Sequence, residues 1–400
     1  MINLLLRAAG LAALALLASC GGNSDNAPTA APSGFSVSPG DSSVVVTWTM
    51  EPGQTYWIFS AAAPSITRDN YRNFPAARIT QPAVSPQIIT GLSNGTTYSF
   101  LINATQGGSP SGPSTTSIAA VPRLAGDAWT LGTPLSVDLN AVGIGGGRYL
   151  AVGNGGAIFT RPAAIDGTWT AATSGVTANL NGLAGSGALA VAVGDNGTII
   201  STTNATDWTA RTSGTTVRLN DAAAVGATLI AVGDNGTLLR SLDAGVNWAA
   251  VTSGTTANLT GASAIGGTFF VLGANGTLLT SVDGGGTWVA QTSGTTATLR
   301  DAVTGGGRTV IVGDGGTILT GTDLVTWTPA TSTTTQALRR VVAGTRFVAS
   351  GANGVLLASA DGLTWTAVNS GTTADLRGLV YGVVLDYLAV GTGGVNAISR

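Results

Sequence analysis

Short runs of small apolar residues recur along residues 127–400 with a period near 40. In each period a leading Leu opens one run, a Gly closes the next, and a Trp opens the last. In the copy that begins at Leu219, Asp234-Asn235-Gly236 separates two runs, and Asn-Gly supplies the positive φ angles of a tight hairpin turn. The pattern predicts four antiparallel strands in this copy, at 219–225, 228–232, 237–240 and from Trp248 onward.

Each marker of the period occurs seven times, and the Trp series is Trp129, Trp169, Trp208, Trp248, Trp288, Trp327 and Trp365. Four-stranded units of this length are typical of β-propeller blades, although a linear solenoid has a similar period. The points in the repeat at which the series begins and ends favour a propeller over a solenoid. The series begins with Trp129, a fourth-strand residue, and ends with a third strand at 395–399. Joining the N-terminal and C-terminal strands in one blade closes a ring and leaves no open sheet edge. The sequence therefore predicts an all-β chain with a seven-bladed β-propeller at 127–400.

Residues 34–122 carry a second set of strand-like runs separated by turn signals, which predicts a β-sandwich. Trp48 lies in an early strand, and Leu92 precedes Tyr98 by six residues. These positions resemble the core Trp and the tyrosine corner of a fibronectin type III domain. Such a domain serves as a spacer or as a ligand-binding module, and the sequence leaves both open.

The N-terminus is typical of an exported protein. An apolar run at 8–18 follows Arg7, is short for a membrane span, and ends in Leu17-Ala18-Ser19-Cys20. This ending resembles the bacterial lipobox, which implies cleavage before Cys20, lipidation of Cys20 and a signal peptide at 1–20. The alternative is an ordinary signal peptide with a chance Cys. Gly21 in place of Asp implies an outer-membrane lipoprotein, and 21–33 forms a flexible tether.

Composition removes many kinds of chemistry. The 400 residues include no His and no Lys, one Glu and one Cys. Catalytic triads, Schiff-base lysines and zinc, haem or iron–sulfur sites built from His or Cys are therefore excluded. Asp, Tyr and oxygen-ligated cations remain, and no cofactor or metal site is predicted. A net charge of −2 gives no indication of a nucleic-acid partner.

A separate motif precedes several of the Trp residues. Residues 281–288 match the Asp-box pattern S-x-D-x-G-x-T-W, and 241–248 are close to it. The carboxylate of such an Asp can accept hydrogen bonds from turn amides while the Trp packs between sheets. We interpret these Asp residues as structural, with Ca²⁺ binding or catalysis as the alternative.

The repeat as a whole, for example residues 299–327, resembles the photosystem II assembly and stability factor family. That resemblance covers about 270 residues and implies a seven-bladed propeller that acts as an assembly chaperone rather than an enzyme. The lipobox and the fibronectin-like domain depart from that family, so the photosynthetic role is not implied.

The residue after each leading Leu, here named the inner position, is expected beside the central channel. The inner positions hold Asn140, Asn181, Asn220, Thr260, Arg300, Arg339 and Arg377, with Arg218 and Arg340 adjacent in sequence. Arg side chains recognise carboxylates and phosphates, and Asn can bind backbone groups or sugar hydroxyls. The alternative is a set of solvated Arg residues paired with Asp301 and Asp375. This cluster is the predicted ligand-binding site.

An enzyme is the competing hypothesis, because sialidases also use Asp-box propellers. By resemblance, a sialidase needs a Tyr nucleophile with a Glu partner, but the sole Glu, Glu51, lies in the sandwich. The propeller Tyr residues Tyr149, Tyr381 and Tyr387 all fall within strand-like runs. The sequence therefore favours a membrane-anchored, non-catalytic binding or assembly scaffold for a protein or glycan ligand. The alternative is a surface glycan-active hydrolase or lyase that uses Asp carboxylates.

Overall fold

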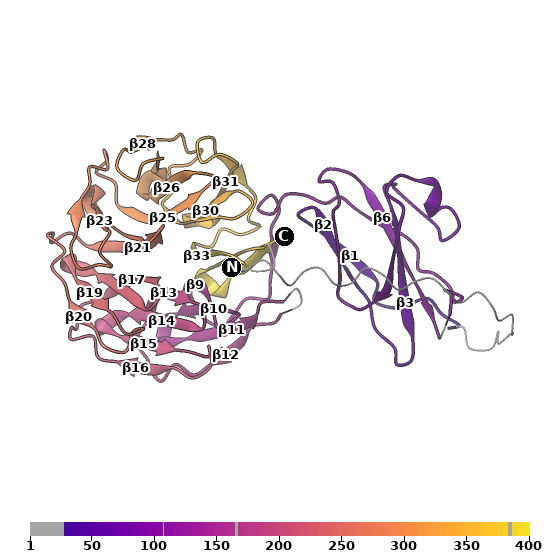
Figure 1. The fold of residues 1–400 in the computed structure, drawn as a ribbon, viewed down its shortest axis with the longest axis horizontal. Coiled ribbons are helices and arrows are strands. Elements are labelled where there is room, and N and C mark those ends of the chain that lie inside the picture. The colour runs from indigo at the N-terminus through magenta and orange to yellow at the C-terminus, as the bar shows by residue number, and fades with distance from the viewer. Residues whose placement is uncertain (1–27, 107, 165–166, 383–385) are drawn as a thin grey trace, which may run out of the picture. The chain divides into compact units, whose positions relative to one another are not determined.

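The structure is a computed structural model that describes residues 28–106, 108–164, 167–382 and 386–400. The predicted lipidation site Cys20 lies outside these residues. Within them the chain is built from β-strands and single-turn 3₁₀ helices, which confirms the all-β class (Figure 1). No helix in the described part of the chain has the length and apolar character that a membrane span requires.

Residues 36–120 form two sheets. One has the order β1-β2-β5 and the other the order β4-β3-β6-β7. Their strands are β1 (Ser36–Gly40), β2 (Ser43–Thr47), β3 (Thr55–Ala61), β4 (Arg78–Ala83), β5 (Gln87–Thr90), β6 (Tyr98–Thr105) and β7 (Ile118–Ala120). One 3₁₀ turn, η1 (Tyr71–Asn73), lies between β3 and β4. Trp48 is buried and packs against Tyr56 with ring centroids 5.4 Å apart.

Seven four-stranded sheets follow, so the predicted β-propeller is consistent with the observed topology (Figure 1). The first three contain β9 (Leu139–Gly145), β10 (Arg148–Gly153), β11 (Ile158–Pro162) and β12 (Thr170–Ala172); β13 (Leu180–Ser186), β14 (Leu189–Gly194), β15 (Ile199–Thr202) and β16 (Thr209–Arg211); and β17 (Leu219–Val225), β18 (Thr228–Gly233), β19 (Leu238–Ser241) and β20 (Ala249–Ala250). The next two contain β21 (Leu259–Ile265), β22 (Thr268–Gly273), β23 (Leu278–Ser281) and β24 (Val289–Ala290); and β25 (Leu299–Gly305), β26 (Arg308–Gly313), β27 (Ile318–Gly321) and β28 (Thr328–Pro329). The last two contain β29 (Leu338–Ala343), β30 (Phe347–Gly351), β31 (Leu356–Ser359) and β32 (Thr366–Val368); and β33 (Leu376–Tyr381), β34 (Tyr387–Gly391), β35 (Asn396–Ser399) and β8 (Thr130–Leu131).

The strand boundaries expected for the Leu219 copy lie within one residue of those observed. The central strand β18 is almost wholly buried, because both of its faces pack against neighbouring sheets. Ile230 and Val232 of β18 share one hydrophobic core with Phe269 and Val271 of the next sheet. Each sheet therefore needs its neighbours to cover its apolar faces, as is usual in repeat proteins.

The turn between the second and third strands of each sheet is a 3₁₀ turn, η2 (Asn154–Gly156), η3 (Asp195–Gly197), η4 (Asp234–Gly236), η5 (Ala274–Gly276), η6 (Asp314–Gly316), η7 (Ala352–Gly354) and η8 (Thr392–Gly394). Asn235 has a φ of 55°, the left-handed value expected of Asn-Gly. Gly233, before the turn, leaves no room for a side chain, because a Cβ there would lie 2.2 Å from the carbonyl oxygen of Arg218.

A β-bulge interrupts the first strand of every one of these sheets. In the β17–β18 pair, Leu219 lies opposite Gly233 and Asp221 opposite Val232, so Asn220 is the extra residue. The same register shift occurs in the other six sheets. A bulge changes the direction of one side chain without ending the sheet. The bulged residues are the inner positions Asn140, Asn181, Asn220, Thr260, Arg300, Arg339 and Arg377.

The two ends of this repeat region pair with one another. Strand β8 runs antiparallel to β35, with Ile398 opposite Thr130 and Ala397 opposite Leu131. The backbone N–H of Gly132 donates to the carbonyl oxygen of Asn396 at 2.9 Å. The last sheet is thus assembled from segments more than 260 residues apart in sequence.

Candidate functional site

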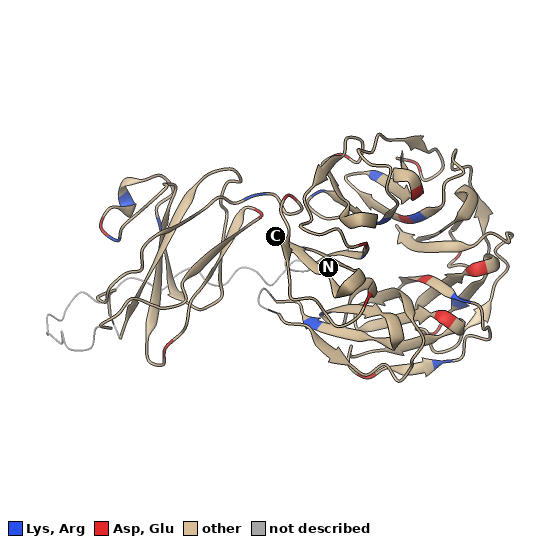
Figure 2. Ribbon diagram, turned by 180° about the vertical axis from the view of Figure 1, so that it is seen from behind, with Lys and Arg blue, Asp and Glu red and all other residues tan. Residues whose placement is uncertain are grey.

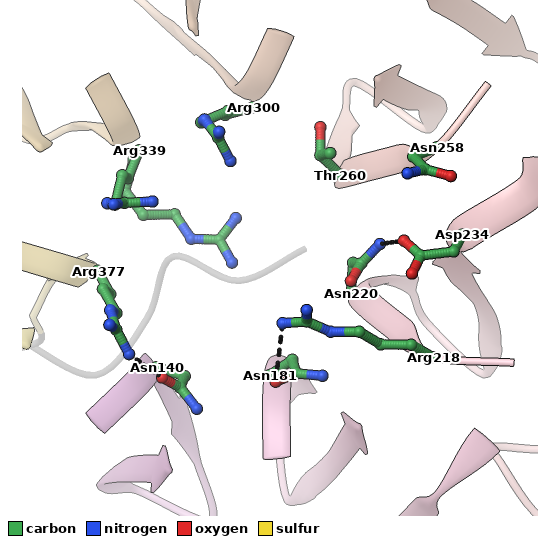
Figure 3. Close-up of a pocket in the computed structure, with 11 residues that line it drawn as sticks. Asn140, Asn181, Arg218, Asn220, Asp234, Asn258, Thr260, Arg300, Arg339 and Arg377 are labelled. Carbon is green, nitrogen blue, oxygen red and sulfur yellow. Dashed lines mark hydrogen bonds between the residues drawn. The ribbon is translucent and has the colours of Figure 1, made fainter. Parts of the chain in front are cut away.

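The inner positions surround a cavity of about 420 Å³ (Figure 3). All eight predicted ligand-binding residues line it, namely Asn140, Asn181, Asn220, Arg218, Arg300, Arg339, Arg340 and Arg377. Thr260, the remaining inner position, also lines it, and the structure adds Asp234 and Asn258. Acidic and basic segments are distributed around the ring (Figure 2).

The Asn and Thr side chains at four consecutive inner positions join adjacent sheets. Each donates a hydrogen bond to the carbonyl oxygen of the leading Leu of the next sheet, in the pairs Asn140–Leu180, Asn181–Leu219 and Asn220–Leu259 at 2.9 Å and Thr260–Leu299 at 2.6 Å. A polar side chain at the inner position thus supplies a hydrogen-bond donor to the carbonyl oxygen of the leading Leu, which the bulge removes from the hydrogen-bond pattern of the sheet. These residues therefore hold the ring together as well as lining the cavity.

The second amide N–H of each Asn is also used. Asn140, Asn181 and Asn220 donate it to Asn154, Asp195 and Asp234 respectively, at 2.8–3.0 Å. An Asn side chain has only two donors, so these three have none left for a ligand. Sequence reasoning expected them to bind backbone groups or sugar hydroxyls, and the geometry leaves only their carbonyl oxygens for that purpose.

The Arg side chains are paired with Asp residues but remain partly exposed. Arg300 donates two hydrogen bonds to the carboxylate of Asp314, of 2.5 and 2.9 Å. Arg339 donates one to Asp375 at 2.8 Å. The remaining contacts are Arg218–Asp195 at 3.2 Å, Arg377–Asp138 at 3.6 Å and Arg377–Asn140 at 2.8 Å. Each guanidinium has five N–H donors, so the contacts named here do not use all of them. The Nε of Arg339 is buried and has no hydrogen-bond partner among the described residues.

Arg340 differs from the other Arg residues because it crosses the channel. Its guanidinium on β29 donates to Asp221 on β17 at 2.6 Å, three sheets away along the chain. Asp221 is buried and also accepts the backbone N–H of Ala262. Asp301 accepts the N–H of Val341 and the hydroxyl of Ser263, each at 3.0 Å. The first strands of four sheets are thereby connected by charged groups.

The surroundings of Asp301 and Asp375 shift the pKa values of these two carboxyl groups in opposite directions. Burial disfavours the charged form of Asp301 and raises its pKa to about 6, against the opposing effect of Arg340. Burial also acts to raise the pKa of Asp375. The backbone N–H of Asn353 and the guanidinium of Arg339 outweigh that effect, so the pKa of Asp375 is lowered. Asp375 thus serves as a counter-ion to Arg339, whereas burial disfavours the charged form of Asp301.

Asp375, which the sequence analysis named as an Arg partner, does pair with Arg339, but the partners Asp195, Asp234 and Asp314 were missed, although a spacing signal identifies them. Asn181 and Asp195, Asn220 and Asp234, and Arg300 and Asp314 are all 14 residues apart. Where the turn begins with Ala274 instead, the inner position is Thr260, which needs no acidic partner. Comparing inner positions with turn positions would have predicted these pairs.

The Asp-box residues have the structural role that was predicted. The carboxylate of Asp283 accepts hydrogen bonds from the backbone N–H groups of Gly286 and Thr287 and from the hydroxyl of Ser281. The turn amides hold the pKa of Asp283 well below its usual range. Trp288 donates its indole N–H to Gly285 within the same turn. The described residues contain no group of three or more Asp, Glu or Cys side chains placed to hold a metal ion.

The Tyr residues considered for a sialidase lie away from the cavity. Tyr149 is fully buried and donates to Asp386, and Tyr387 is buried and donates to the carbonyl oxygen of Arg346. Burial and the hydrogen bond to Asp386 raise the pKa of Tyr149 far above its usual value. Neither hydroxyl is available as a nucleophile for a ligand in the cavity.

Comparison with known proteins bears on the fold. No family profile and no curated protein matches the sequence. Among solved structures, YCF48 bound to D1 peptide matches with a TM-score of 0.57 and 17% identity, over 68% of this chain and 94% of that chain. The chain contains a β-propeller. YCF48 from Cyanidioschyzon merolae matches with a TM-score of 0.57 and 16% identity, over 68% of this chain and 99% of that one.

Propellers of other kinds match equally well. The WD40 propeller domain of Doa1 has a TM-score of 0.57 and 11% identity, over 69% of this chain and 96% of its own. The predicted resemblance to the photosystem II assembly factor is therefore confirmed for the propeller fold, and identities this low establish nothing beyond the fold.

Proposed function

We propose that this protein is a non-catalytic binding or assembly scaffold that takes an acidic group of a protein ligand into the Arg-lined cavity. Residues 127–400 act as one seven-bladed propeller, closed by the pairing of β8 with β35. The observation that carries the proposal is the convergence of five Arg side chains on one cavity, with N–H donors left over after their Asp contacts. Free guanidinium donors in a concave site are suited to carboxylates.

A peptide is the ligand that we favour over a glycan. A structure of YCF48, which shares this fold, contains a bound D1 peptide. The three Asn side chains that could donate to a sugar hydroxyl already use both amide N–H groups, one on the next sheet and one on the turn of their own sheet. Peptide carboxylates need only donors, and the Arg residues supply them.

The enzyme alternative, a glycan-active hydrolase or lyase, needs a free carboxylate as acid or base. Asp301 has the raised pKa of a general acid, but both of its oxygens accept hydrogen bonds within the protein. Asp221 is held through its Oδ2 by the guanidinium of Arg340 and the backbone N–H of Ala262. These contacts favour the scaffold over the enzyme.

The remaining parts of the chain complete the proposal. Lipidation of Cys20 anchors the protein in the outer membrane, and residues 21–33 serve as a tether. The sheet orders β1-β2-β5 and β4-β3-β6-β7 support a fibronectin type III-like domain at 34–122. We assign that domain the role of a spacer.

The test is a binding screen with an array of acidic peptides, alongside neutral peptides and a glycan array. We expect selective binding of acidic peptides, lost in a variant with Arg300, Arg339 and Arg377 all changed to Ala. Arg211→Ala is the matched control, because Arg211 lies on the outer strand β16 and bonds only Ser201 among the described residues. Glycan binding with no peptide binding, or full affinity in the triple variant, would overturn the proposal.

A further inference from the structure

The face of the propeller opposite the cavity exposes large aliphatic side chains. They lie on the turns between the third and fourth strands of four consecutive sheets. Their exposed fractions are 61% for Leu242, 85% for Val282, 61% for Val325 and 43% for Leu363. Single exposed aliphatic residues are common on proteins, but the same turn bearing one in four adjacent repeats is a surface feature.

These four side chains are here named the aliphatic tips. The direction of the strands places them on the opposite side of the propeller from the cavity. The strands of each sheet are antiparallel, so successive turns alternate between the two ends of the sheet. The turn at Asp234 joins the second and third strands and lines the cavity. The turn at Leu242 follows the third strand and therefore lies at the other end. One face is thus a polar cup, and the other carries aliphatic tips.

Hydrogen bonds within each turn hold the tip in place in the free protein, before it contacts any other surface. In the first of these turns, Ser241 Oγ accepts the N–H of Gly245 at 2.9 Å, and Asp243 accepts the N–H of Asn247 at 2.9 Å. Trp248 fixes the base of the turn through its indole N–H to Gly245 at 3.0 Å. An ordered turn loses little conformational entropy when its tip is buried, so contact there is favoured.

Charges of both signs surround the tips. Each of the four turns carries one Asp that is ionised, because hydrogen bonds from its own turn lower its pKa, namely Asp243, Asp283, Asp323 and Asp361. The side chain of Arg240 lies against the turn at 284–286, and that of Arg308 against Gly362. This face therefore has no strong net attraction for an anionic surface, and its affinity must come from the aliphatic groups.

We propose that this face rests on a phospholipid bilayer, with Leu242, Val282, Val325 and Leu363 inserted at the boundary between headgroups and acyl chains. The inference rests on the lipid anchor of the proposed function, which holds the chain at a membrane. Each tip belongs to a different sheet, so the tips form separate points. A fluid surface accepts separate points without a complementary shape, whereas a protein partner would have to match them.

Site-specific labelling tests the insertion directly. Cys20 is the only Cys, so a chain starting at Gly21 has none, and it also lacks any acyl group. An environment-sensitive fluorophore is placed on Val282→Cys, and on Val289→Cys as the control, because Val289 is 60% exposed but lies on the outer strand β24. With phosphatidylcholine vesicles we expect a blue shift, and quenching by spin-labelled lipid, at position 282 only. No change at 282, or equal changes at both positions, would overturn the proposal.

Vesicle partitioning gives the second measurement. Changing all four tips to Ser should lower the partition coefficient by about tenfold or more, whereas Val289→Ser should leave it unchanged. Binding should persist at high salt and be no stronger for phosphatidylglycerol than for phosphatidylcholine, since the contact is apolar. Binding that depends on anionic lipid would contradict the mechanism. The mechanism would also be contradicted if the chain bound no vesicles but formed a dimer, and if the four-Ser variant lost that dimer. The mass of the mature N-terminus reports separately on the anchor.

Discussion

The guanidinium of Arg340 and the carboxylate of Asp221 meet at 2.6 Å across the central channel, although 119 positions separate them in sequence. The side chain of Asp221 is 4% exposed and that of Arg340 is 17% exposed. A buried ion pair adds little net stability, but removal of one partner leaves an uncompensated charge. The pair therefore makes the stability of one half of the ring depend on the other.

Removing one partner of the Arg340–Asp221 pair should lower the free energy of unfolding. We expect Arg340→Met to lower the free energy of unfolding by about 3 kcal/mol, because Asp221 is left buried and unpaired. The double variant Arg340→Met with Asp221→Asn should recover part of the loss. Denaturant unfolding measures both, with Arg211→Ala as the control. Equal losses in the single and double variants would show that packing, not charge, is responsible.

Stability should depend on pH through Asp301. Its pKa is about 6 in the folded chain and 3.8 for an unperturbed Asp. Between those values the folded state binds the proton more tightly, so the contribution of Asp301 is largest below pH 4 and declines as the pH rises to about 6. The difference in unfolding free energy between the parent and Asp301→Asn should follow this decline. A difference that grows with pH across the same range would mean that the carboxylate is stabilised in its charged form.

Pairing of β8 with β35 should be required for a stable ring. Deleting residues 127–133 removes β8 and leaves an unpaired edge on β35. We expect aggregation, or a fall in melting temperature of roughly 10 °C or more, in scanning calorimetry. A deletion variant that melts with the parent would refute closure by these strands.

Acylation of Cys20 should decide where the protein partitions. Cys20→Ser should move it from the membrane fraction to the soluble fraction, and the parent should carry the extra mass of a diacylglycerol on its mature N-terminus. Mass spectrometry of the N-terminal peptide checks the modification. An unmodified N-terminus in the parent would rule out the anchor.

Much of the fold was predictable, because a repeat presents the same local rule many times. The alternation around Leu219, the Asn235-Gly236 turn and the position of Trp248 placed four strands to within one residue. Local propensity and turn chemistry act over a few residues, so the sequence alone specified the sheets. The sequence also predicted that the Arg and Asn residues at the inner positions lie close together, because equivalent residues of successive repeats face the same axis.

Tertiary structure decided what those side chains do. The bulge at Asn220 depends on the close approach of the next sheet, and Asn220 then donates to Leu259 and Asp234 rather than facing solvent. The contact of Arg340 with Asp221 depends on how far the ring curves, which no local pattern records. Periodicity in the chain thus determines which residues reach the channel. The distances between sheets, set by core packing, determine which of them become partners, because hydrogen bonds and ion pairs form only within about 3–4 Å.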